Sequence, residues 1–264
     1  VSLFIYYTLY KGNVYSLALL IFSLYAQASG GLIYLNIFNA LYYFAVSFFP
    51  ILVVAINDFD VPKKAMAQMP GLYTAGIERT QFTMKGFWLW TLDSIYAALV
   101  TAYVPMLGLQ AVLFAGHFDA GSYWMLSWAS MHIIALGCNA RLLFEIRSWS
   151  VLEHGFFWFT VGFFFLWIII FSFTWYPFNQ HLRSYSWIPL YGLLEPSYAS
   201  PEFWLIVFLG VVATCLPRII GKAYVLCFVP ESAAKKARRR LSLEEERATS
   251  TKQVGGPPAT LSKT

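Results

Sequence analysis

Charged residues are scarce in this sequence, and their scarcity excludes an ordinary soluble domain. Only 12% of the 264 residues are charged, whereas 59% are hydrophobic. Soluble globular domains carry about a quarter charged residues, roughly twice this share. The apolar runs are continuous and reach the roughly 20 residues that a helix needs to cross the hydrocarbon core of a bilayer. Strands of a transmembrane barrel would alternate apolar and polar residues instead. We therefore predict an all-α membrane protein with several spans.

Cysteine and histidine are also few, with three and four copies. Cys138, Cys215 and Cys227 lie in or beside apolar runs, and their number and spacing match no disulfide framework, metal site or redox motif. We expect them to be buried and unreactive. The histidines are scattered, and none pairs at the spacing of metal ligands. Interfacial or packing roles are therefore expected for them, and no metal site is predicted.

The sequence does contain six long apolar segments, and each is predicted to form one transmembrane helix. They cover Val1–Leu24, Leu32–Ile56, Phe87–Leu109, Tyr123–Leu143, Phe156–Trp175 and Phe203–Val229. Residues 1–230 are thus expected to form one membrane domain. Residues 231–264 begin with a charged block and end rich in Ser, Thr, Pro and Gly, so a disordered tail is predicted there. Because Val1 already lies inside an apolar stretch, we expect the chain to be the C-terminal part of a longer protein.

The distribution of Lys and Arg predicts how these spans are oriented. One set of connectors carries most of the basic residues, namely Lys63, Lys64, Arg79, Lys85, Arg141 and Arg147, and the opposite set carries Arg183 alone. Connectors rich in Lys and Arg lie on the cytoplasmic side. Both ends of this chain are therefore predicted to be cytoplasmic. The net charge of +5 follows mainly from this asymmetry and gives no reason to expect a nucleic-acid partner.

Several polar residues lie inside the predicted spans. Lys11 is the clearest, and a lysine at the bilayer centre costs roughly 2.5–3.5 kcal/mol, so it normally faces a polar cavity or a partner. A lysine near the interface can instead extend its amine to water and do nothing else, and the sequence leaves both interpretations open. Pro50 removes a helical hydrogen bond and is expected to kink the second span, with Ser47 one turn before it. Asp93 is a weaker candidate, and Asn139 also falls within a span.

Taken in order, several motifs resemble those of one known family. The connector after the second span contains Asn57-Asp58-Phe59-Asp60, then Pro70-Gly71-Leu72-Tyr73, then Phe82-Thr83-Met84-Lys85-Gly86-Phe87-Trp88. Tyr10-Lys11 and Ser29-Gly30 occur before it, and Glu145-Ile146-Arg147-Ser148-Trp149 follows the fourth span. This series is similar to the last six spans of phospholipid flippases, the type IV branch of the P-type ATPases. The resemblance covers residues 1–230.

The resemblance implies a lipid path along the first two spans. The family lysine matched by Lys11 lies beside that path and is implicated in coupling lipid movement to dephosphorylation. Two positions depart from the family pattern. The asparagine after the lysine is displaced to Asn13, and the family's Tyr-Asn in the next span is replaced by Tyr42-Tyr43. The implied candidates for the lipid path are Lys11, Asn13, Tyr43, Ser47 and Pro50, and no catalytic residue is expected in the chain.

The sequence lacks the Asp-Lys-Thr-Gly motif that P-type ATPases phosphorylate. ATP and Mg²⁺ are therefore expected to act in catalytic domains upstream of Val1. The resemblance further implies a phospholipid substrate and an accessory β-subunit, for which the aromatic loop Tyr176–Pro201 is the expected contact. A six-span membrane scaffold or decoy subunit without catalysis is the alternative function.

The start of the tail is basic, with Lys235, Lys236 and the run from Arg238 to Arg240. Ser242 follows this run at a spacing typical of phosphorylation sites and is a candidate phosphosite. A charge-regulated membrane tether and a simple topological anchor are both consistent with this pattern.

Overall fold

The structure is a computed structural model, and it describes residues 2–30, 33–34, 38–39, 42–43, 48–57, 82–114, 122–146, 151–179 and 194–228. These residues form helices and turns and no strand. The helices are α1 (Ser2–Tyr25), α3 (Phe48–Asn57), α6 (Met84–Phe114), α7 (Ser122–Leu143), α8 (Val151–Asn179), α9 (Leu194–Ala199) and α10 (Pro201–Phe228). The all-α class predicted from the sequence is confirmed for this part of the chain.

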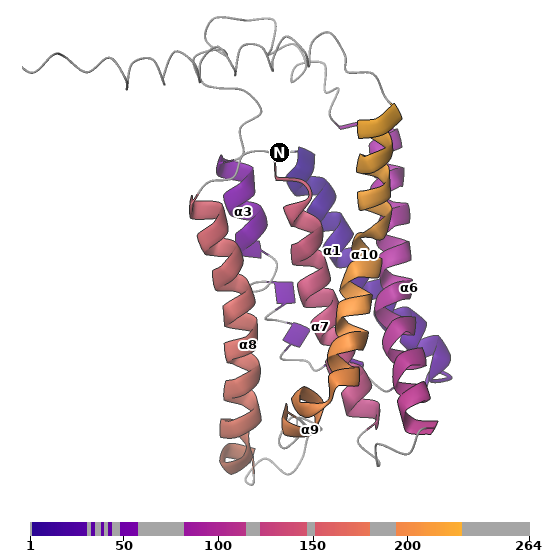
Figure 1. The fold of residues 1–264 in the computed structure, drawn as a ribbon, viewed down its shortest axis with the longest axis vertical. Helices are drawn as coiled ribbons and strands as arrows, with labels where there is room; N and C mark the ends of the chain where they lie inside the picture. Colours follow the sequence, from indigo (N-terminus) through magenta and orange to yellow (C-terminus); the bar gives the residue numbers. More distant parts are fainter. Residues whose placement is uncertain are drawn as a thin grey trace, which may run out of the picture.

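The long helices lie side by side, roughly along one axis (Figure 1). α6 packs against α1, α7 and α10, and α10 packs against α7 as well. α8 stands further out and contacts α3 and α7. The short α9 lies beneath the start of α10 (Figure 1). The core of this bundle is therefore built where α1, α6, α7 and α10 meet.

Three of the helices are long and apolar enough to cross a membrane, over Met84–Leu109, Val151–Ile170 and Pro201–Phe228. Each of them contains the greater part of a predicted span. α1 and α7 have 24 and 22 residues, a sufficient length, but they carry more polar side chains. The second predicted span, Leu32–Ile56, is described only in part, with α3 as its last ten residues. The tail, residues 231–264, lies outside the described residues.

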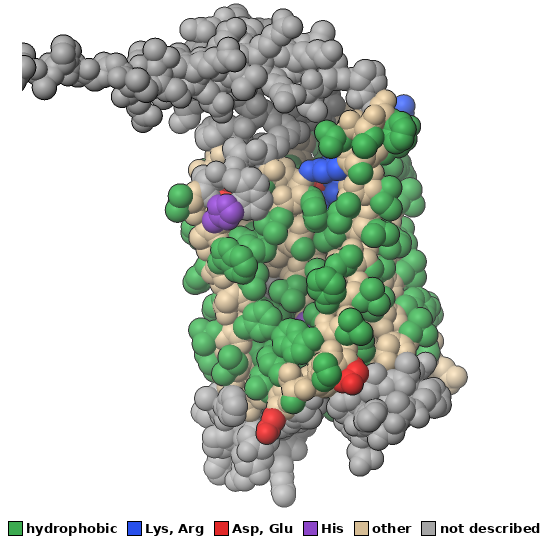
Figure 2. Space-filling view, viewed as in Figure 1, with side chains coloured by type: hydrophobic (Ala, Val, Ile, Leu, Met, Phe, Trp, Pro, Cys, Tyr) green, Lys and Arg blue, Asp and Glu red, His purple; other side chains and the backbone are tan. Residues whose placement is uncertain are grey.

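The outer surface of the bundle supports a membrane environment. Large exposed apolar side chains are frequent on α6, α8 and α10, and Trp88, Leu107, Trp158, Leu205 and Phe208 are examples. Figure 2 shows that hydrophobic side chains cover the middle of one face, whereas the charged side chains lie near its two ends. Soluble monomers rarely expose large contiguous apolar patches, and lipid tails are the natural contact for this surface.

The α7–α10 interface depends on close backbone approach. A Cβ added at Gly137 of α7 would lie 2.8 Å from the Thr214 hydroxyl oxygen of α10, and one added at Gly210 of α10 would overlap the side chain of Ile133. A Cβ at Gly108 of α6 would meet Ile206 of α10 at the same distance of 2.8 Å. Small residues at helix–helix contacts allow such packing where the surrounding lipid supplies no hydrophobic force.

Candidate functional site

Lys11 lies inside the bundle, near the middle of α1. Only 4% of its surface is exposed, and it shares the buried face of the helix with Tyr7, Val14, Tyr15 and Ala18. These positions recur at spacings of three and four residues, so they form one stripe along a helix. The side chain is therefore enclosed by protein and does not lie on the outer surface.

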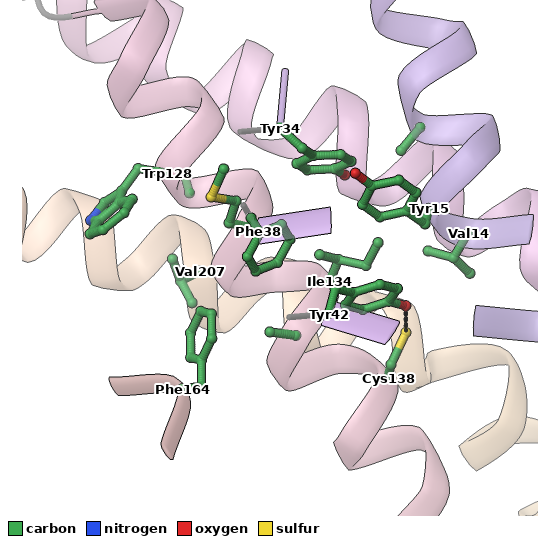
Figure 3. Packing of buried hydrophobic residues seen from close by; sticks show 14 of the residues in the cluster. Val14, Tyr15, Tyr34, Phe38, Tyr42, Trp128, Ile134, Cys138, Phe164 and Val207 are labelled. Carbon is green, nitrogen blue, oxygen red and sulfur yellow. Dashed lines mark hydrogen bonds between the residues drawn. The ribbon is translucent and has the colours of Figure 1, made fainter. Parts of the chain in front are cut away.

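A small polar cluster surrounds the backbone of Lys11. The Tyr42 hydroxyl donates a hydrogen bond to the Lys11 carbonyl oxygen at 3.1 Å and lies 3.3 Å from the Cys138 Sγ. The Tyr7 hydroxyl donates to the Cys138 carbonyl oxygen at 3.1 Å. Figure 3 shows Tyr42 pointing at Cys138, with Tyr15 and Tyr34 in the adjoining aromatic layer. This cluster connects α1, α7 and the segment that contains Tyr42.

Asn13 does not join this cluster. Asn13 follows Lys11 by two residues, which is a rotation of about 200° around the helix axis. It therefore faces α6, where its amide donates a hydrogen bond to the Ser94 hydroxyl at 3.3 Å. It lines a narrow cleft between α1 and α6 together with Thr91 and the aromatic rings of Tyr6 and Trp90. The structure thus separates two of the residues that the family resemblance groups along one path.

The remaining candidates are only partly described. Tyr43 is 38% exposed and places its ring edge against Tyr15, with 5.4 Å between ring centroids. Pro50 is buried in the described part of α3, close to its start at Phe48. Ser47 and the candidate phosphosite Ser242 lie outside the described residues. The kink expected around Pro50 therefore stays a prediction.

A second polar cluster is built around Arg141 at the end of α7. Its Nε and Nη2 atoms each lie 3.0 Å from Asp93 Oδ2 on α6, and its Nη1 atom pairs with Glu145 Oε1. The other oxygen of Glu145 pairs with Arg218 of α10. The guanidinium also stacks over the ring of Trp90, 4.4 Å from the centroid. Two carboxylates and two guanidiniums balance one another, so the cluster connects three helices without a net charge.

Cation–π contact extends the Arg141 cluster to α1. The Arg141 guanidinium carbon lies 5.6 Å from the ring centroid of Tyr10, the residue next to Lys11, and Tyr10 meets Trp90 edge-on at 5.9 Å. Such contacts are worth about 0.5–2 kcal/mol depending on desolvation. The rotation of α1 near Lys11 is therefore restrained by contacts on two sides.

A third buried group is His132, in the middle of α7. Its Nδ1 lies 2.7 Å from the Trp128 carbonyl oxygen and its Nε2 lies 2.8 Å from the Tyr198 hydroxyl of α9. Because a carbonyl only accepts, Nδ1 carries the proton and Nε2 accepts from Tyr198. Rings of Phe164 and Phe203 surround it at centroid distances of 5.2 and 5.3 Å. This agrees with the packing role expected from the sequence and anchors α9 to the bundle.

Three assignments made from the sequence change with the structure. Asp93, only a weaker candidate from the sequence, forms a buried ion pair with Arg141 of α7. Cys138 and Cys215 are buried as expected, but Cys227 is exposed near the end of α10. Tyr42, which contacts Lys11 and Cys138, is a residue that the sequence analysis does not select. Tyr43 is selected there because it replaces the asparagine of the family's Tyr-Asn pair. The position of Tyr42 in the same pair is the signal that could have identified it.

Among the described residues, no group of three or more His, Cys, Asp or Glu side chains could hold a metal ion. The full sequence has no Asp-Lys-Thr-Gly phosphorylation motif.

Comparison with known proteins agrees with these features. The family model described as "Phospholipid-translocating P-type ATPase C-terminal" matches residues 1–231. Phospholipid-transporting ATPase DNF1 of Saccharomyces cerevisiae is 23% identical over 225 residues, which are 84% of this chain and 14% of that protein. Phospholipid-transporting ATPase 6 of Arabidopsis thaliana is 22% identical over 225 residues, covering 83% of this chain and 17% of its own length.

A relative from Chaetomium thermophilum, also named phospholipid-transporting ATPase DNF1, is 22% identical over 175 residues, 66% of this chain and 11% of that protein. The chain thus spans less than a fifth of the length of each of these relatives. The match to the family model extends through all the helices described above, from α1 to α10. The chain belongs to the family of phospholipid-translocating P-type ATPase C-terminal regions.

Proposed function

We propose that this chain is the C-terminal membrane part of an ATP-driven flippase that moves phospholipid from the outer to the cytoplasmic leaflet. Family membership supports the substrate class. The observation that carries the proposal is Lys11, a lysine with 4% of its surface exposed in the middle of a membrane helix. A basic residue is expensive in that environment and is retained there for an interaction.

The lipid route proposed for this chain follows α1 and the segment after it. Lys11 would face the phosphate or carboxylate of a headgroup as it passes, and Pro50 and Ser47 would shape the path beyond. Asn13 would act on the α6 side, through its contact with Ser94. Tyr43 is exposed enough to meet a lipid from the side of Tyr15.

Catalytic domains upstream of Val1 would bind ATP and Mg²⁺ and form the phosphoenzyme. Relatives more than five times longer than the matched region leave room for such domains. Both ends of this chain would be cytoplasmic by the distribution of Lys and Arg. Residues 1–230 would form the membrane domain, and residues 231–264 a disordered tail that anchors the topology, with Ser242 as a possible point of phosphorylation.

An accessory β-subunit is the proposed partner, with contacts in the loop Tyr176–Pro201. Of this loop, Leu194–Ala199 forms α9, and Tyr198 holds it to His132. Replacing Tyr185, Trp187 and Tyr191 by Ser is expected to reduce co-purification of the β-subunit. Undiminished recovery would reject this loop as the contact.

The test of the proposed function is Lys11→Ala in the full-length protein. ATP turnover is measured with vesicles of phosphatidylserine, phosphatidylethanolamine or phosphatidylcholine, alongside the yield of folded protein. We expect loss of most lipid stimulation at nearly unchanged yield, because the substitution removes a side-chain contact with the lipid and no backbone hydrogen bond of the helix.

Lys85→Ala provides the matched control, since this lysine is exposed at the start of α6. It should leave lipid stimulation as in the wild type. Unchanged lipid stimulation in Lys11→Ala would overturn the role of Lys11. If no lipid stimulates the wild-type protein, the scaffold function is the better description.

A further inference from the structure

Tyr42 makes the closest described contact between the second predicted span and Lys11. Its side chain is fully buried, and its hydroxyl is within hydrogen-bond distance of two different helices. A carbonyl oxygen only accepts, so the Tyr42 hydroxyl donates to Lys11. The thiol of Cys138 is then the donor to the Tyr42 oxygen. The result is a short chain of hydrogen bonds from α7 through Tyr42 to the backbone of α1.

Aromatic packing holds the Tyr42 hydroxyl in place. Its ring stacks on Tyr15 with 5.2 Å between centroids and contacts Phe38 at 5.9 Å. Tyr15 lies one turn after Lys11 on the same buried stripe of α1. A side chain whose rotamer is already fixed by packing gives up little further entropy when it forms a hydrogen bond. The geometry at Lys11 is therefore preorganised by Tyr42.

Tyr7 fixes the position of α1 along α7 from the other side of Lys11. It lies one turn before Lys11, and its hydroxyl reaches the carbonyl oxygen of Cys138 at 3.1 Å. Cys138 thus contacts tyrosines on both sides, through its backbone and through its thiol. A shift of α1 along α7 by one residue, about 1.5 Å, would break the Tyr7 contact with Cys138 and move the Lys11 carbonyl away from the Tyr42 hydroxyl. The height at which Lys11 lies in the bundle is fixed at this point.

Two neighbouring tyrosines lack this arrangement. Tyr34 is also fully buried and stacks on Tyr15 at 4.8 Å, but its hydroxyl bonds to Ser130 of α7 at 3.2 Å. Tyr43 is partly exposed, and its ring meets Tyr15 at an angle of 61°. Tyr34 is therefore a matched control for the loss of a buried hydroxyl. Tyr43 is the residue of this segment that the sequence motif predicts to lie on the lipid path.

We propose that Tyr42 is a positioning residue for Lys11 and sets how tightly the transported phospholipid is held. This inference rests on the proposed function, because it assumes that Lys11 faces the lipid path. Tyr42 acts through the backbone of Lys11 and through the register of α1 on α7, and it does not contact the lipid. A small displacement of a binding group weakens binding although the group itself is still present.

The experiment compares Tyr42→Phe with Tyr34→Phe in the full-length protein with the same three phospholipids. For Tyr42→Phe, we expect the KM for phospholipid to rise roughly two- to tenfold, the effect of one hydrogen bond, with kcat little changed. Tyr34→Phe also removes a buried hydroxyl, so it should lower the unfolding temperature about as much as Tyr42→Phe does. It should leave the KM for phospholipid unchanged. The double variant Lys11→Ala/Tyr42→Phe should lose no more lipid stimulation than Lys11→Ala alone, because the two changes act through one group.

Equal KM values for Tyr42→Phe and Tyr34→Phe would overturn the inference. Additive losses in the double variant would also overturn it, since they would show that Tyr42 acts independently of Lys11. Unchanged stimulation in Lys11→Ala would refute the proposed function and this inference together. Loss in Lys11→Ala with a normal KM in Tyr42→Phe would refute the inference alone.

Discussion

The side chain of Arg141 connects several elements at one end of the bundle. It is 2% exposed and contacts two carboxylates and two aromatic rings, on α6, on α1 and in the turn that follows α7. A buried ion pair adds little net stability over an apolar replacement, because both charges must leave water. Removal of one partner is costly, because the other charge stays buried and uncompensated. Arg141 therefore specifies how α6, α7 and α10 meet more than it stabilises them.

We predict that Arg141→Met lowers the free energy of unfolding by about 3–5 kcal/mol. Adding Asp93→Asn should recover part of this loss, since it removes the carboxylate left without its partner. Thermal unfolding in detergent, followed by size-exclusion chromatography, measures both variants. Arg218→Met is the control, and its cost should be smaller because the Arg218 side chain is 34% exposed. A double variant less stable than Arg141→Met would contradict the argument.

Glu145 gives the same cluster a pH dependence. Burial by itself would raise the pKa of the Glu145 carboxyl, but the guanidiniums of Arg141 and Arg218 outweigh burial and hold the pKa below its ordinary value of 4.5. A carboxyl whose pKa is lowered on folding stabilises the folded state at pH above the ordinary value. It loses that contribution as the pH falls through the folded pKa.

The unfolding temperature should therefore be insensitive to this residue near neutral pH and should decline below about pH 4.5, where the unfolded chain takes up the proton first. Glu145→Gln should be less stable at neutral pH and show a shallower decline in acid. Thermal scans of both proteins across this range measure the difference. Parallel curves for the two proteins would exclude Glu145 as a source of the acid sensitivity.

At the scale of elements, the stability of the bundle depends on how closely the backbones of α7 and α10 approach each other. We predict that Gly210→Ala destabilises the bundle by about 1–3 kcal/mol, because the added methyl group overlaps Ile133 and the helices must separate or repack. Gly221→Ala on the same helix is the matched control. No atom lies within 4 Å of its added Cβ, and alanine favours a helix by about 1 kcal/mol over glycine.

Thermal unfolding of the two glycine variants in detergent separates the effects. The expected order is Gly221→Ala at or above the wild type, and Gly210→Ala below it. If both variants shift in the same direction, helix propensity rather than close packing controls this interface.

The sequence predicted the elements better than the contacts between them. Continuous apolar runs identified α6, α8 and α10, since length and hydropathy are local properties. Predicted spans began or ended several residues inside the observed helices, because polar residues such as Lys85 at the start of α6 continue a helix beyond the apolar segment. α9 was missed within a loop rich in Pro and aromatic residues, and it depends on a contact between Tyr198 and His132, 66 residues apart.

The candidate site shows the same limit. Lys11 stood out because a lysine inside an apolar run is conspicuous, and Asn13 followed from the family motif. Their separation onto two faces of α1 follows from helix geometry and could have been derived. The pairing of Asp93 with Arg141 could not, because the two residues are 48 positions apart and only the packing of α6 on α7 brings them together.

For the whole molecule, helix length and charge place the membrane boundary. α10 has 28 residues, about 42 Å of helix, against a hydrocarbon core of about 30 Å. Its start is packed in the bundle through the buried Phe203 and capped by Ser200, whose hydroxyl accepts a hydrogen bond from the Phe203 backbone. The excess therefore lies at the C-terminal end, where Lys222 is exposed. Residues after Lys222 are expected at the interface or in water.

Cys227 provides a natural probe of this boundary and of the orientation of the whole chain. It is exposed, whereas Cys138 and Cys215 are buried. We predict that a membrane-impermeant maleimide labels Cys227 in inside-out vesicles and not in intact cells, because the end of α10 belongs to the basic, cytoplasmic set of connectors. Peptide mass spectrometry identifies the labelled cysteine, and Cys227→Ser, which removes the only exposed thiol of the described residues, is the control. Labelling of Cys227 from outside intact cells would reverse the predicted orientation, and with it the direction in which the proposed flippase moves lipid past Lys11.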